Sequence, residues 1–200
     1  MGMTCTLRRA SDADVRQLVA DPTQAGSFLY GPPAVVRRVQ PRGVLGLILR
    51  LLPIRIEEVD PSAPLPAPPG DDVLDLEKSW HGLHFLFTGS AQETQLPKGF
   101  LISGGMDLET EDDDSVPRLL DVDQVREIDA FLQSLSRDEL TRRYDARRMT
   151  ELEIYPDVIW MRETDGDYSA LDHLLDAFDE LRAFIAAARE RGEAVVVGVS

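Results

Sequence analysis

Cysteine is almost absent from this sequence of 200 residues, in which Cys5 is the only one. A single cysteine excludes an intrachain disulfide and a zinc site built from several thiolates. It also excludes the Cys-x-x-Cys pair of a thiol redox protein. We expect Cys5 to be a small buried residue in a strand and not a nucleophile.

Long hydrophobic runs and lysine are also scarce. The best apolar stretch, from Val44 to Leu52, is too short to cross a bilayer and contains Arg50. The N-terminal residues lack the apolar core of a secretory signal, which predicts a cytoplasmic protein. A formal net charge of −15 argues against a nucleic-acid partner, because an acidic surface repels phosphate. The only lysines are Lys78 and Lys98.

The motifs of common catalytic and nucleotide-binding sites are missing too. There is no G-x-S-x-G elbow, no G-x-x-x-x-G-K-[ST] phosphate loop and no G-x-G-x-x-G dinucleotide turn. His81 and His84 are three residues apart, but a zinc site needs three or four ligands. Neither Glu77 nor Thr88 completes a set locally, and His173 lies in another predicted helix. No metal and no cofactor are therefore expected.

The most informative stretch is DLEKSWHGLHFLFTG, residues 75–89. Its apolar side chains recur with the spacing of one helical face: Leu76, Trp80, Leu83 and Phe87. Asp72 or Asp75 can cap the start of this helix, and Gly89 suits the left-handed residue that ends it. The spacing predicts that His81 and His84 project from neighbouring positions.

The rest of the chain mixes helix and strand signals without strict alternation. Capping boxes at Ser11 and Asp121 predict helix starts, Ser136 provides a third, and Gly192 ends a long C-terminal helix. Strands are expected at residues 3–9, 96–103, 152–160 and 194–199, and the last reads as a central strand because it is apolar at consecutive positions. This pattern predicts an α+β fold, with a mixed or antiparallel sheet packed with several helices in a single compact domain spanning residues 1–200.

An irregular, proline-rich insertion is expected at about residues 31–70. It contains an apolar segment that begins at Val44 and ends at Ile56 and is flanked by arginines. One interpretation is a short element that covers the core. The alternative is an amphipathic patch that touches a membrane surface or, preferably, mediates self-association.

An acidic run begins at Glu109 and ends at Asp114. It lacks the glycine bend and the closing glutamate of an EF-hand loop. A solvated loop is therefore expected in place of a calcium site.

The aromatic and histidine residues around the central helix have structural and functional interpretations. His84 is expected to be half-buried and bonded to a backbone carbonyl or Thr88, or else to act as a general acid or base. Trp80, Tyr155 and Trp160 either pack in the core or line a ligand pocket together with His81 and His84.

Several of these residues also carry a family resemblance. The chain resembles the YfbM-like family of small bacterial proteins in the initial M-G-M, the W-x-x-L-H and T-G of the central helix, the I-Y-P at residues 154–156 and the C-terminal helix with its valine-rich strand. The resemblance covers residues 1–22 and about 71–200. It implies a compact α+β domain and no particular reaction, and the proline-rich stretch is longer than it implies.

Three functional hypotheses follow. The first is a cytosolic binding or interaction module without its own catalysis, with an unknown protein or small-molecule partner. The second is a hydrolase-like enzyme with His84 as acid or base and Trp80, His81 and Tyr155 around the substrate. The third is an acidic, immunity-type neutraliser of a basic partner.

Overall fold

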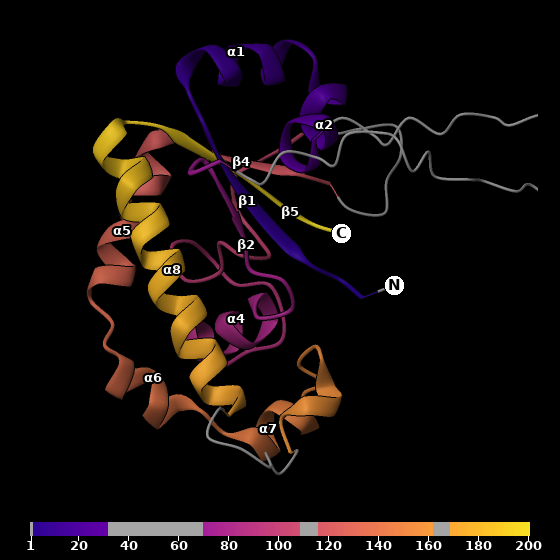
Figure 1. Ribbon diagram of the computed structural model, residues 1–200, viewed down its shortest axis with the longest axis vertical. Coiled ribbons are helices and arrows are strands. Elements are labelled where there is room, and N and C mark those ends of the chain that lie inside the picture. Colours follow the sequence, from indigo (N-terminus) through magenta and orange to yellow (C-terminus); the bar gives the residue numbers. More distant parts are fainter. Residues whose placement is uncertain (1, 32–69, 109–115, 162–168) are drawn as a thin grey trace, which may run out of the picture.

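The computed structural model describes residues 2–31, 70–108, 116–161 and 169–200. An antiparallel sheet of five strands lies at its centre, in the order β2-β1-β5-β4-β3 (Figure 1). The strands are β1 (Cys5–Ala10), β2 (Val73–Asp75), β3 (Met106–Asp107), β4 (Arg118–Leu120) and β5 (Ala194–Val199). β5 pairs with both β1 and β4, which confirms the central strand expected from its apolar sequence.

The helices are divided between the two faces of the sheet (Figure 1). One face packs against α1 (Asp12–Ala20) and α2 (Ala25–Tyr30), which are joined by the 3₁₀ turn η1 (Pro22–Gln24). The other face carries the larger core and packs against α4 (Trp80–Thr88), α5 (Val122–Gln133), α6 (Arg137–Arg143), α7 (Ala146–Glu151), η2 (Asp157–Ile159) and α8 (Ala170–Arg191). The predicted α+β class with an antiparallel sheet is confirmed.

The alternation of side chains along the strands separates the two cores. Cys5 and Leu7 of β1 point to the larger core, whereas Ala10 points to the smaller one. In β5, Val197 belongs to the larger core and Val196 to the smaller. Successive residues of a strand face opposite sides, so a fully apolar strand such as β5 fits only where both faces are covered.

The capping signals in the sequence are confirmed. Ser11 and Asp121 each cap a helix through a complete capping box, and Ser136 accepts a hydrogen bond from the backbone of α6. Gly192 ends α8 in the left-handed conformation with φ 65°. Ser169 opens α8 with a further capping box.

Two predicted strands are wrong. Residues 96–103 form consecutive turns, and residues 152–160 follow the end of α7 as a turn, irregular backbone and η2. Phe100, Leu101, Ile154 and Trp160 are nevertheless buried. Their apolar character reflects burial in loops that cover the core and not strand pairing.

Parts of the predicted organisation lie outside the described residues. These are nearly all of the insertion at 31–70, including the segment from Val44 to Ile56, and the acidic run from Glu109 to Asp114. Within the described residues, no helix is long and apolar enough to cross a bilayer.

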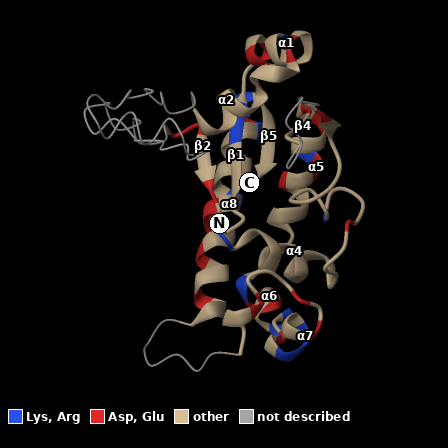
Figure 2. Ribbon diagram, turned by 90° about the vertical axis from the view of Figure 1, so that its right-hand side faces the viewer, with Lys and Arg blue, Asp and Glu red and all other residues tan. Residues whose placement is uncertain are grey.

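Charged side chains link the helices at the end of the molecule far from α1. Arginines gather on α6 and α7, and acidic residues follow α8 (Figure 2). Arg137 of α6 lies 3.1 Å from Asp176 and 2.5 Å from Asp179, both on α8. These half-exposed pairs orient α6 against α8 and contribute little net stability.

We expect the packing of α8 against α4 to dominate the stability of the larger core. Phe178 of α8 is fully buried, and its ring lies 6.2 Å from that of Phe87 in an edge-to-face arrangement. Phe178→Ala should lower the free energy of unfolding, measured with urea, by about 3–5 kcal/mol. Val19→Ala, at a side chain that is 52% exposed, should change it by less than about 0.5 kcal/mol. Equal effects of the two substitutions would contradict this arrangement of the core.

Candidate functional site

The histidine-bearing helix α4 starts later than the sequence pattern predicts. Residues 73–75 pair with β1 as strand β2, so Asp72 and Asp75 do not cap the helix. Ser79 occupies the N-cap position without a capping hydrogen bond, and Gly89 ends the helix with φ 73° as expected. Since every residue from Gly82 to Phe87 is buried, α4 is a core helix, and the side chain of His84 lies within the core.

The imidazole of His81 is hydrogen-bonded at both nitrogens. Nε2 donates to the carbonyl of Ala91 (3.1 Å), and Nδ1 accepts from the backbone N–H of Tyr155 (2.9 Å). A carbonyl only accepts and a backbone N–H only donates, so the ring is neutral and protonated on Nε2. Burial lowers the pKa of His81 and favours the same neutral state. With both nitrogens engaged, His81 has no lone pair available for a metal.

His84 lies one turn further along α4 and is fully buried. Its Nε2 donates to the carbonyl of Gln92 (2.9 Å), and Nδ1 has no partner among the described residues. Burial lowers the pKa of His84, and a charge on His81 would lower it further, because the two ring centres are 6.3 Å apart. The carbonyl partner expected for His84 is confirmed, but the side chain is wholly buried and not half-buried.

The aromatic residues gather around the same helix. Trp80 stacks on His81 with ring centres 4.9 Å apart, and on Tyr155 at 6.2 Å. Trp160 donates from Nε1 to the carbonyl of Ile154 (2.6 Å) and is 4% exposed. The five site residues expected from the sequence therefore come together as a packed cluster around α4.

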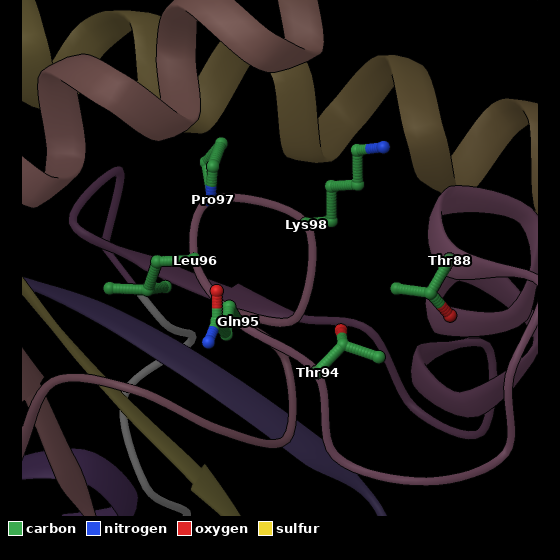
Figure 3. A pocket seen from close by; sticks show the side chains of 6 residues that line it. All are labelled: Thr88, Thr94, Gln95, Leu96, Pro97 and Lys98. Carbon is green, nitrogen blue, oxygen red and sulfur yellow. The ribbon is translucent and has the colours of Figure 1, made fainter.

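The two histidines hold the segment that follows the helix, which we call the pocket loop (residues 90–98). His81 bonds to Ala91 and His84 to Gln92, so two consecutive carbonyls of the loop are fixed to α4. A pocket of about 370 Å³ lies between Thr88, at the end of α4, and the far part of this loop. It is lined by Thr88, Thr94, Gln95, Leu96, Pro97 and Lys98. Figure 3 shows Thr94 and Lys98 on the side of the loop that faces Thr88, with Leu96 pointing away.

Arg118 of β4 supports the chain just beyond the pocket loop. Its guanidinium donates to the carbonyls of Leu101 and Gly104 (2.8 Å each) and of Phe100 (3.2 Å). Burial lowers the pKa of this group, but an arginine so far above neutrality stays charged. Sequence reasoning missed the pocket residues because it assigned residues 96–103 to a strand. The proline and glycines at 97, 99, 104 and 105 were the available signal of turns.

Other reactive side chains have structural partners. Cys5 is fully buried, and burial raises the pKa of its thiol to about 12, which makes it inert at neutral pH. Ser79 Oγ lies 2.9 Å from Nε2 of His173 on α8, a contact that the sequence pattern did not indicate. Within the described ranges, no group of three or more ligating side chains could hold a metal ion.

The fold and the site define a small α+β domain in which a core helix, packed on an open antiparallel sheet, carries one fully buried and one partly buried histidine. The chain belongs to the family described as domain of unknown function DUF1877, whose model matches residues 1–198. It is 31% identical to Protein YfbM of Escherichia coli strain K12 over 132 residues, which is 62% of this chain and 75% of that protein. The YfbM-like resemblance is thus confirmed.

The fold is also found in a solved structure. The crystal structure of YfbM from Escherichia coli, titled a protein of unknown function, superposes with a TM-score of 0.59. The match covers 98% of this chain and 99% of that one at 19% identity, and at this identity it supports the fold alone.

The neutral state of the two histidines makes stability depend on pH. Because both pKa values are lowered by folding, the unfolded chain binds more protons below its ordinary histidine pKa of about 6.5. The stability that the neutral rings confer is complete above that pH and is lost as the pH falls through the lowered values. We expect urea unfolding of the parent to show a larger loss between pH 7 and pH 5 than the double variant His81→Gln/His84→Gln. Parallel pH profiles would contradict this.

Gly82 separates α4 from its neighbours in the larger core. A Cβ at this position would lie 2.8 Å from the ring of Trp160 and 2.8 Å from a methyl group of Leu174. Gly82→Ala should therefore destabilise the protein by about 1–3 kcal/mol, although alanine is the better helix former by about 1 kcal/mol. Gly26→Ala in α2, where a Cβ meets nothing within 4 Å, is the matched control and should be neutral or stabilising. A stabilising Gly82→Ala would show that Trp160 does not pack on this helix.

Proposed function

We propose that this protein is a binding module whose ligand occupies the pocket between α4 and the pocket loop. The observation that carries the proposal is the fixed position of the pocket wall. The partly buried imidazole of His81 and the fully buried imidazole of His84 bond to consecutive loop carbonyls, and Arg118 bonds to three more carbonyls beyond the loop. A wall that is ordered before the ligand arrives spares the ordering cost of binding.

The lining of the pocket favours a small anion that carries a carboxylate or phosphate group. Lys98 is the one charged residue of the lining, and it has no ion-pair partner among the described residues. Thr94 Oγ1 is buried without a partner within the same part of the chain, and Gln95 adds an amide. An ammonium, a hydroxyl and an amide N–H donate to an anionic oxygen, and Pro97 adds apolar contact. The pocket volume of about 370 Å³ suits a small metabolite.

The hydrolase alternative is less well supported by the geometry. A general base must reach its substrate, whereas His84 is fully buried and bonded to a carbonyl. Ser79 and His173 provide a hydroxyl beside an imidazole, but Ser79 is only 2% exposed. Covalent labelling of Ser79 by a fluorophosphonate, detected by intact mass spectrometry and absent in Ser79→Ala, would contradict a purely binding role.

The remaining expectations rest on composition alone. A role as acidic neutraliser depends on the run from Glu109 to Asp114, and self-association depends on the segment from Val44 to Ile56. Both lie outside the described residues. A bacterial, cytoplasmic location and the exclusion of nucleic acid remain predictions from the sequence.

The two lysines of the chain allow a matched test of the pocket. Amide chemical shifts of the ¹⁵N-labelled protein would be followed during titration with glutamate, succinate and inorganic phosphate at pH 7.5, with glutamine as the neutral counterpart. We expect at least one anion to shift the amides of residues 88–98. Lys98→Met should weaken its affinity about tenfold or more, because a charge-assisted hydrogen bond contributes about 1.5–3 kcal/mol.

Lys78→Met is the control, since it removes the same charge outside the pocket. Equal weakening by both variants would show a nonspecific charge effect. Unchanged amide shifts at residues 88–98 with all three anions would refute the proposed ligand class.

A further inference from the structure

We propose that His81 and His84 form a latch on the pocket loop that opens when the rings are protonated, so that the pocket holds its ligand near neutral pH and releases it in acid. The part of this inference that concerns the ligand rests on the proposed function of the pocket. The latch itself rests on the hydrogen bonds of the two rings.

The bond between Tyr155 and His81 cannot survive protonation of the ring. The backbone N–H of Tyr155 points at Nδ1 of His81 from 2.9 Å. A proton on Nδ1 places two donors face to face, so the charged ring must turn or move away from Tyr155. Because Nε2 of the same ring holds Ala91, movement of His81 strains or breaks the bond to the pocket loop as well.

Protonation of His84 is opposed for a different reason. Its Nδ1 is buried and has no hydrogen-bond partner in the described part of the chain, so a new N–H there would be left unsatisfied. The other nitrogen already donates to Gln92 and gains no new acceptor when the ring is charged. A charged His84 is therefore relieved only if the helix end and the loop separate and admit water.

The charges around the two rings do not compensate for protonation. The titratable and charged side chains on the segments next to them include Glu77 and Lys78 before α4, Glu93 and Lys98 in the pocket loop, Arg143 of α6, which donates to the carbonyl of Leu86, Tyr155 and Asp157 beyond α7, and Asp172, His173 and Asp176 on α8. None of them bonds to either ring through its side chain. Burial is the main influence on both histidines, and the charge that acts on His84 is that of His81. Protonation of one ring therefore lowers the pKa of the other ring until the latch opens.

Opening would be confined to the pocket loop, because the chain beyond it is held by hydrogen bonds that do not involve the two histidines. Ser103 Oγ donates to the carbonyl of Thr94, and Arg118 holds the carbonyls of Phe100, Leu101 and Gly104. None of these groups titrates between pH 5 and pH 8. Thr88 stays on α4, so release of Ala91 and Gln92 changes the distance between the two walls of the pocket.

Hydrogen exchange of single backbone amides tests the latch without any ligand. The reporters are the amides of Ser90 and Gln92, which bond to side-chain oxygens of Thr88 and Ser90. Their protection factors would be measured at pH 7.5 and pH 5.0, each corrected for the intrinsic pH dependence of exchange. We expect protection to fall about tenfold or more in the parent, since protonation of the rings removes the hydrogen bonds that close the loop and their combined loss corresponds to about that factor. In His81→Gln/His84→Gln, whose amides donate to carbonyls but do not titrate, it should fall less than about threefold.

His173→Gln is the matched control and should behave as the parent, because His173 contacts Ser79 and not the pocket loop. Amides of β5 should keep their protection at both pH values, which separates local opening from global unfolding. An equal loss of protection in the parent and the double variant, or no loss in the parent, would overturn the latch.

Two further measurements test the latch if the double variant does not fold. In the parent, the amide shift of Tyr155 should titrate together with the imidazole of His81, and independence of the two would overturn the latch. An anion that binds residues 88–98 equally tightly at both pH values would also overturn it while leaving the pocket intact. A loop that opens in acid in a protein that binds none of the probes would support the latch and refute the proposed ligand class.

Discussion

The structure around α4 depends on hydrogen bonds between neutral imidazoles and backbone groups. His81 joins the helix to the pocket loop through Ala91 and to the segment after α7 through Tyr155, and His84 adds a parallel bond to Gln92. A lysine or arginine could donate to these carbonyls but could not accept the N–H of Tyr155. An aspartate could accept that N–H but could not donate. Histidine does both in one rigid ring, which explains why this residue type suits a helix that lies deep in the core.

The rest of the fold places this helix where those bonds can form. The central strand β5 is apolar on both sides, and its larger-core face supports α8, which in turn packs on α4 through Phe178 and Phe87. Gly82 lets Trp160 and Leu174 approach the helix closely. The stack of Trp80, His81 and Tyr155 then closes the end of the core. The pocket loop is thus held by side chains whose own positions are fixed by packing.

Short sequence motifs correctly predicted the helix ends and the central strand, which are determined by residues close together in the sequence. Capping boxes at Ser11 and Asp121, the left-handed glycines at 89 and 192, and the double-sided apolar pattern of β5 are all confirmed. The wrong predictions concern segments whose structure is set by contacts with residues far away in the sequence. Residues 96–103 are held in turns by Arg118, whose place on β4 cannot be read from the loop itself. Asp75 belongs to strand β2 because it pairs with β1. The helix predicted from the apolar spacing therefore begins only at Trp80. The sequence also predicted that the site residues cluster, but not that His81 and His84 bond to adjacent carbonyls, because both partners lie in an irregular loop.

The most direct measurement of this account is the tautomeric state of the two imidazoles at pH 7.5. The ¹⁵N shifts of the ring nitrogens distinguish a protonated from a bare nitrogen, and long-range correlations assign each to Nδ1 or Nε2. The hydrogen bonds of the two rings require both His81 and His84 to be neutral and protonated on Nε2, because each Nε2 donates to a carbonyl. A charged ring, or a proton on Nδ1 of His81, would contradict it. For His81, either result would mean that the bond from Tyr155 could not exist, and the pocket loop would have to be held in some other way.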